Sequence, residues 1–206
     1  MSIDKSRTIV REAMKLFLKK GYGAVSMNEI LGRVGGSKTT IYARFRDKAS
    51  LFATVIDELL REIVNYDTEG LEEFAVEEAL MEIARRHLKM ALSERYVQLI
   101  RMVVAEVHQF PELGQTFYEH GPARSYQNFA DYLRYQTAAG TLTIADVRLA
   151  ADLFFGTLLH RRVLTRIYGV EPPPQDIEEI ARVGVTEFLN IYANPDAGPQ
   201  RRRLIA

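Results

Sequence analysis

Start and stop signals for helices follow one another so closely near the N-terminus that two short helices must form there. Ser26 and Glu29 have the spacing of a capping box, which marks the start of the first. Gly35-Gly36 ends that helix, and Ser37 can cap the next, which we expect over residues 38–46. A tight, glycine-containing turn between two short helices is the pattern of a helix-turn-helix.

The remaining apolar residues also recur at three- and four-residue spacings, which predicts an all-α chain. The first helix is expected over residues 5–20, and Asp47 can cap a long helix over 48–66. Breaks at Pro and Gly divide the rest of the chain into further expected helices at about 71–91, 94–110, 112–119, 123–139, 144–168 and 175–193.

The charge of the chain is unevenly distributed. The 206 residues have a net charge of zero, yet residues 1–50 contain 11 basic and 4 acidic side chains, and the remainder is correspondingly acidic. This asymmetry indicates a nucleic-acid or membrane contact near the N-terminus. There is no cysteine and no apolar run of membrane-spanning length. We therefore expect a soluble, cytoplasmic protein.

The helix expected at 38–46 has two different faces. On a helical wheel Ile41 and Phe45 fall together and must point inward, which places Thr39 and Ala43 at the centre of the opposite face. A face with small residues at its centre can enter the major groove of DNA and bring side chains to base edges. A solvated polar face is the alternative interpretation.

The chemistry of the side chains suggests a role for each. Lys38 can reach a base acceptor or a phosphate, and Thr39 can reach a base edge, whereas Thr40 and Tyr42 are sized to bond phosphate oxygens. Lys48 adds an ammonium group at the first turn of its helix, where an anion is favoured.

Residues 13–56 resemble the N-terminal domain of TetR/AcrR-type repressors. The matching motifs are Leu16-Phe17, Gly21-Tyr22, the cap Ser26, the run 35–45 and the run 48–52. The resemblance implies an N-terminal three-helix helix-turn-helix domain joined to a C-terminal helical ligand-binding and dimerisation domain, with about nine to ten helices. We assign residues 1–47 to the first, 48–193 to the second and 194–206 to a frayed tail, whose arginines are expected to be a solvated end.

At matching positions the resemblance implies contacts with double-stranded operator DNA. The residues concerned are Ser26, Lys38, Thr39, Thr40, Tyr42, Arg44 and Lys48. Three positions depart from the usual family pattern, namely Leu31, Gly36 and Thr39. Family members often have glycine where Thr39 stands, so this side chain is expected to read a base.

The last two expected helices carry more apolar surface than a small domain needs, which favours a homodimer. In the TetR family the last two long helices form a four-helix dimer interface, and Gly156 and Gly184 would allow close approach. The expected interface residues are Leu153, Phe154, Leu158, Ile177, Ile180, Ala181, Gly184 and Phe188. An ordinary monomer core is the alternative.

The family also implies an effector site among the middle helices. An aromatic and methionine-rich set suits a small, largely apolar molecule, although each residue could instead be plain core. The candidates are His87, Met90, Met102, Phe110, Phe117, Tyr118, Tyr126, Phe129 and Tyr132. The effector would release the repressor from a palindromic operator by preferring a conformation with mis-spaced DNA-binding domains.

Other function classes find less support in the sequence. The four histidines lack metal-site spacing, and no Gly-rich phosphate loop is present, so we expect no enzyme, no metal and no cofactor. A helix-turn-helix regulator controlled by a protein partner, or one acting as an activator, remains an alternative.

Overall fold

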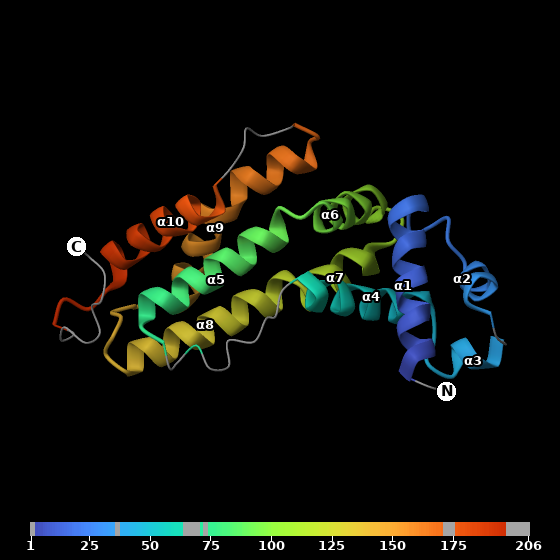
Figure 1. Cartoon of the computed structure of the whole chain (residues 1–206), viewed down its shortest axis with the longest axis horizontal. Helices are drawn as coiled ribbons and strands as arrows, with labels where there is room; N and C mark the ends of the chain where they lie inside the picture. Colours follow the sequence, from blue (N-terminus) through green and yellow to red (C-terminus); the bar gives the residue numbers. More distant parts are fainter. Residues whose placement is uncertain (1–2, 36–37, 64–70, 72–73, 171–175, 197–206) are drawn as a thin grey trace. The chain divides into compact units, whose positions relative to one another are not determined.

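The computed structural model describes residues 3–35, 38–63, 71, 74–170 and 176–196. These residues form ten helices and, apart from the isolated bridge between Leu142 and Ala193, no extended pairing (Figure 1). The helices are α1 (Ile3–Lys20), α2 (Met27–Val34), α3 (Lys38–Tyr42), α4 (Lys48–Ile63), α5 (Val76–Ala91), α6 (Glu94–Glu106), α7 (Pro111–His120), α8 (Pro122–Ala138), α9 (Val147–Ile167) and α10 (Ile177–Tyr192). The all-α prediction is confirmed. Within the described ranges, no helix is long and apolar enough to cross a membrane.

The chain divides into two compact units. The first consists of Met1–Glu62 with Glu94–Ala123, and the second of Ile63–Ser93 with Arg124–Ala206. This division differs from the boundary expected at residue 47, because α4, α6 and α7 pack in the same unit as the three N-terminal helices. The expected frayed tail lies largely outside the described residues, as does the expected cap Ser37.

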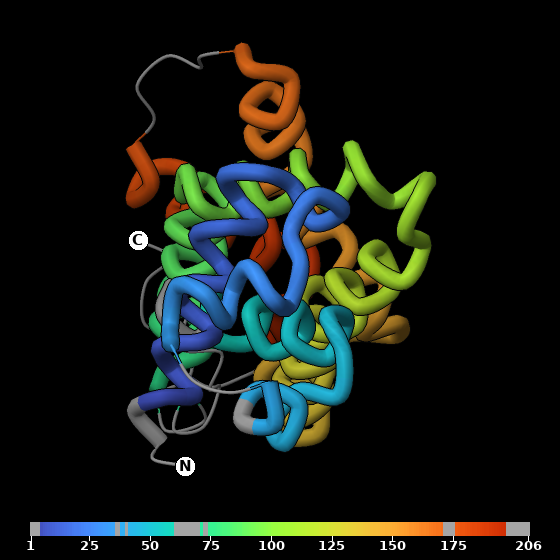
Figure 2. The backbone as a smooth tube through the Cα atoms, turned by 90° about the vertical axis from the view of Figure 1, so that its right-hand side faces the viewer, coloured from blue at the N-terminus to red at the C-terminus, as the bar shows by residue number. Residues whose placement is uncertain are grey.

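The first unit is built around a cluster of aromatic rings. Phe17 of α1, Tyr22 of the following turn and Phe52 of α4 are all buried, with ring centroids 5.3–5.7 Å apart. The short helix α2 packs against α1 and α3 against α2, as the neighbouring blue segments of the tube show (Figure 2). Aromatic pairs at these distances add about 0.5–1.5 kcal/mol each beyond the burial of their surface.

Local capping fixes where these short helices start. The backbone N–H of Glu29 donates to Ser26 Oγ at 3.1 Å, which confirms the predicted cap of α2. The Glu29 carboxylate does not return to the cap but accepts a 2.6 Å hydrogen bond from Lys20. Asp47 caps α4 as predicted, accepting from Ser50 N at 2.8 Å. Helix α3 is shorter than expected, because the i→i+4 pattern ends with Ala43 and Phe45 and then gives way to a turn.

The second unit packs α5, α9 and α10 against one another, and α8 contributes to the same core. Phe129 of α8 lies at its centre, with ring centroids 4.6 Å from Phe154 and 5.1 Å from Phe155. Helix α9 starts at Val147 and not near 144, because the Asp146 carboxylate caps it through the N–H groups of Arg148 and Leu149.

A clasp of backbone hydrogen bonds joins the α8–α9 loop to the end of α10. Thr143 N donates to Tyr192 O at 2.8 Å, and Asn194 N donates to Thr141 O at 3.1 Å. The Asn194 side-chain amide adds a bond to Gly140 O at 2.9 Å. These three bonds hold the isolated bridge in place and satisfy backbone groups that neither helix can pair.

Candidate nucleic-acid interface

Helix α3 and the turn that follows it present the two faces that the sequence predicts. Ile41 and Phe45 are buried, whereas Thr39 and Ala43 are exposed on the opposite side. Lys38 and Arg44 are also exposed. The side chain of Thr40 lies outside the described residues. An exposed face of small, polar and cationic residues is therefore available to a ligand surface.

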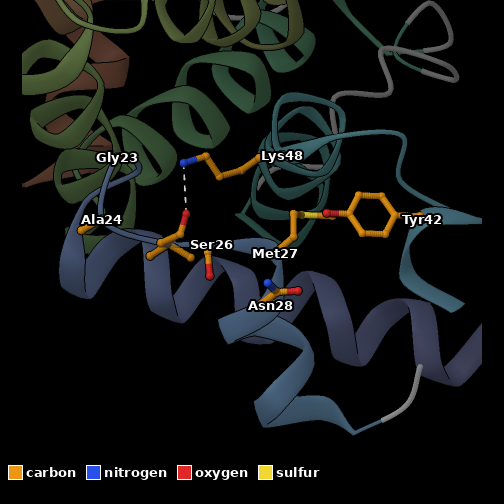
Figure 3. A pocket seen from close by; sticks show the side chains of 8 residues that line it. Gly23, Ala24, Ser26, Met27, Asn28, Tyr42 and Lys48 are labelled. Atoms are coloured by element: carbon orange, nitrogen blue, oxygen red, sulfur yellow. Dashed lines mark hydrogen bonds between the residues drawn. The ribbon is translucent and has the colours of Figure 1, made fainter. Parts of the chain in front are cut away.

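A pocket of about 390 Å³ lies beside α3, at the start of α2. Figure 3 shows Ser26 and Asn28 entering it from the start of α2, Tyr42 from the end of α3 and Lys48 from α4. It is lined by Gly23, Ala24, Val25, Ser26, Met27, Asn28, Tyr42 and Lys48. The structure thus brings together three of the residues predicted to contact DNA, although Tyr42 and Ser26 are 16 positions apart.

Lys48 is held by the turn that precedes α2. Its Nζ donates to the carbonyl oxygens of Tyr22 at 2.9 Å and Val25 at 3.0 Å, and a dashed line from Lys48 marks one such bond in Figure 3. The ammonium also lies 4.1 Å from the centroid of the Tyr22 ring, within cation–π range. Burial lowers the pKa of Lys48, and the carboxylates of Glu106 and Glu112 oppose that shift. With two N–H groups engaged, one remains for a ligand.

Ser26 and Tyr42 complete the polar lining of the pocket. Ser26 is exposed, and its Oγ accepts the N–H of Glu29, so the hydroxyl proton is directed elsewhere. Tyr42 is 48% exposed, which leaves its phenol accessible. The pocket thus combines the hydroxyls of Ser26 and Tyr42, the side-chain amide of Asn28 and the Lys48 ammonium at the start of a helix. This combination is suited to an anion.

Two residues from α6 and the turn after it reach this region, and no local sequence pattern indicates this contact. Glu106 Oε2 accepts the backbone N–H of Gly23 at 2.5 Å, and the Phe110 ring lies 5.3 Å from that of Tyr22. Burial, together with the carboxylates of Glu112, Asp47 and Glu106, raises the pKa of Tyr22 to about 12. Contacts across more than 80 positions leave no local signal.

The residues predicted to line an effector site divide between the two units. Met102, Phe110, Phe117 and Tyr118 belong to the first, and His87, Met90, Tyr126, Phe129 and Tyr132 to the second. Tyr118 is 61% exposed, whereas Phe129 and Tyr132 belong to the core of the second unit. His87 and Tyr126 both pack against the Phe155 ring, at 4.6 and 4.9 Å. A common effector site for these residues remains a prediction.

The residues predicted for the dimer interface are mostly covered by their own chain. Phe154, Leu158, Ala181, Gly184 and Phe188 are buried in the second unit, and Ile177 and Ile180 pack against that core. Leu153 is the exception in this set, with 45% of its surface exposed. Apolar periodicity located the helices but not the partner that covers each face.

Two family models match the chain. The C-terminal domain of AefR-like transcriptional repressors matches residues 78–194, and the model of bacterial regulatory proteins of the tetR family matches residues 9–55. The chain belongs to the TetR family of transcriptional regulators. The predicted resemblance is thereby confirmed, and the helix-turn-helix at α2 and α3 falls inside the N-terminal match.

Solved structures of TetR-family regulators resemble the whole chain. The flavonoid-responsive regulator FrrA is 30% identical, with 95% of this chain and 100% of that chain covered and a TM-score of 0.77. A TetR-family regulator from Mesorhizobium loti MAFF303099 is 29% identical, with 94% and 100% covered and a TM-score of 0.78.

Curated relatives match over a shorter stretch. The HTH-type transcriptional regulator YhgD of Bacillus subtilis is 35% identical over 72 residues, 35% of this chain and 38% of the relative. The HTH-type transcriptional repressor ComR of Escherichia coli is 37% identical over 71 residues, 34% of each chain. The chain thus matches only about a third of the length of these two relatives.

Proposed function

We propose that this regulator is a homodimeric repressor that binds a palindromic operator and is released by a small, largely apolar effector. The observation that carries the proposal is the pocket where Ser26, Tyr42 and Lys48 converge, beside the exposed face of α3. We propose no catalytic role for it.

In this proposal the pocket receives one phosphate of the DNA backbone. The remaining N–H of Lys48 and the hydroxyls of Ser26 and Tyr42 would donate to its oxygens, and the positive end of the α2 dipole favours the same charge. The phosphate contact would orient α3 so that Lys38 and Thr39 reach base edges in the major groove. The pocket positions the protein, and α3 supplies the sequence preference.

The proposed dimer uses the exposed face of α9 and α10. On α9, Leu149, Leu153 and Gly156 follow one another at helical spacing and are exposed. A Cβ on Gly156 would meet nothing within 4 Å, so this face can accept a close helix from a second copy. On α10, Val183 and Ile191 are exposed apolar residues of the same kind.

For the effector, we propose a flat, mostly apolar molecule that binds in the second unit near an aromatic group. His87 and Tyr126 pack on Phe155, and FrrA, which shares 30% of the sequence, is described as flavonoid-responsive. Flavonoids are flat, polyphenolic molecules, and we propose that an aromatic compound of that kind is the effector. A thermal shift with naringenin, absent with a charged sugar phosphate, would support it.

The decisive experiment measures binding to the intergenic DNA upstream of the protein's own gene over a series of salt concentrations. Lys48→Ala should weaken binding and reduce the salt slope by about one per DNA-binding domain, since a phosphate contact is lost. Tyr42→Phe should weaken binding by about tenfold, the loss of one hydrogen bond to a charged group. Lys89→Ala and Tyr135→Phe, exposed residues outside the pocket, serve as matched controls.

The proposal fails if the wild-type protein shows no DNA preference, or if Lys48→Ala leaves both affinity and slope unchanged. Dimerisation is tested separately by the molecular mass in solution. Leu153→Glu should yield monomers, because a charge would be buried in the interface. Val104→Glu, at an exposed position of α6, should leave the mass unchanged. A monomeric wild type would overturn the dimer.

A further inference from the structure

We infer that Glu106 and Phe110 are positioning residues of the phosphate pocket: they touch no DNA but hold the turn that places Lys48. This inference rests on the proposed function of the pocket. Both residues belong to the first unit, at the end of α6 and in the turn that follows it.

The Glu106 carboxylate occupies space that only glycine leaves open. Its Oε2 accepts the Gly23 N–H at 2.5 Å. A Cβ on Gly21 would collide with Glu106 Oε1, and one on Gly23 would lie 3.0 Å from Oε2 and 2.9 Å from a Phe110 ring carbon. Gly21 also has φ +84°, where a side chain is strained. The turn between α1 and α2 is therefore shaped around Glu106 and Phe110.

Phe110 contacts the same turn through the ring of Tyr22. Its ring meets the Tyr22 ring edge to face, at 5.3 Å and 72°, and the Lys48 ammonium lies 5.5 Å from its centroid. The Phe110 N–H donates to the backbone carbonyl of Glu106 at 2.9 Å, so the two residues are fixed to each other. They therefore hold the turn beside the pocket together.

The turn between α1 and α2 provides the carbonyl groups that hold the Lys48 ammonium. Lys48 bonds the carbonyls of Tyr22 and Val25, and residues 23–26 form one wall of the pocket. Loss of the Glu106 bond would free the turn at its middle and shift those carbonyls. The Lys48 ammonium would still neutralise the phosphate, but it and the Ser26 hydroxyl would meet the phosphate oxygens at poorer hydrogen-bond geometry.

The negative charge of Glu106 and its positioning role predict opposite effects on DNA affinity when the residue is replaced, which makes the inference testable. Removing a carboxylate near a phosphate site should by itself favour DNA, since repulsion falls. The positioning role predicts that Glu106→Ala binds about tenfold more weakly at every salt concentration, with an unchanged salt slope, because no phosphate contact is lost. Glu106→Gln keeps an acceptor for Gly23 and should bind at least as well as the wild type.

Two further measurements separate positioning from misfolding. Glu94→Ala removes a carboxylate from the opposite end of α6, where it bonds only Gln98 among the bonds described, and should leave DNA affinity within twofold. Amide exchange of Gly23, read by NMR without DNA, should accelerate in Glu106→Ala and stay slow in Glu106→Gln, while melting curves show that both are folded.

The outcomes are distinct. Unchanged or tighter DNA binding by a folded Glu106→Ala protein overturns the inference, and so does a slope reduced like that of Lys48→Ala. If Lys48→Ala itself leaves DNA binding intact, the proposed pocket function fails, whatever the Gly23 exchange rate shows.

Discussion

Gly184 of α10 lies against Leu158 of α9 so closely that a Cβ atom at residue 184 would be 2.5 Å from Leu158 Cδ2. Leu158 is buried in the core of the second unit and has little room to move. Gly184→Ala should therefore lower the free energy of unfolding by about 1–3 kcal/mol, the usual cost of overpacking. Urea unfolding measures it.

Gly32 of α2 provides the matched control for that substitution. A Cβ there would meet nothing within 4 Å, and the residue is exposed. Gly32→Ala should raise the unfolding free energy by about 0.5–1 kcal/mol through helix propensity alone. Equal effects of the two alanines would contradict the close contact at Gly184.

The contribution of the α4 cap to the stability of the fold should depend on pH in the acid range. The hydrogen bond from Ser50 N, followed by that from Arg46, lowers the pKa of Asp47 below 3.8. A carboxyl whose folded pKa is lowered stabilises the fold above the unfolded value and loses that contribution as pH falls through the folded value. Asp47→Ala should cost about 1 kcal/mol at pH 7. The difference from the wild type should shrink below pH 3.8; a gap that persists in acid would contradict this.

His87 should make the fold sensitive to mild acid. Burial lowers its pKa from 6.5 to about 4, and the ring packs on Phe155. Between these two values the unfolded chain takes up a proton that the folded chain refuses, so stability falls as pH falls, by about 1.4 kcal/mol per unit at most. His87→Gln should flatten that dependence between pH 6.5 and 4.5. His108→Gln, at an exposed position, should retain it.

Phe129 and Tyr118 were both candidates for the effector site, and stability distinguishes them. Phe129 is 1% exposed and packs against three phenylalanine rings, so Phe129→Ala should lower the unfolding free energy by about 3–5 kcal/mol. Tyr118→Ala, at an exposed position, should change it by less than about 0.5 kcal/mol. Similar losses would contradict the packing, and denaturant midpoints compare them directly.

Local signals made much of the first unit predictable. The caps Ser26 and Asp47 act within three residues, and the inward pair Ile41 and Phe45 follows from one helical period. Such interactions depend on neighbours in the chain, so they can be predicted from the sequence. The shared family extended this to the whole fold.

Interactions between distant segments were not predictable. The contact of Phe110, a predicted effector residue, with Tyr22 had no local signal, and neither had the two backbone carbonyls that hold Lys48, a predicted DNA contact. Phe154 and Phe188 looked like dimer surface and are buried in their own unit. Apolarity and charge indicate that a side chain needs a partner, but not which of several segments provides it.

The clasp at residues 140–143 and 192–194 gives the second unit a fixed point of exit. Because Asn194 is tied by two hydrogen bonds to the α8–α9 loop, whatever follows it in the chain departs from an anchored position and not from a fraying helix end. A reporter attached at Pro195 would therefore follow the α8–α9 loop as well as the end of α10, because Asn194 is bonded to that loop.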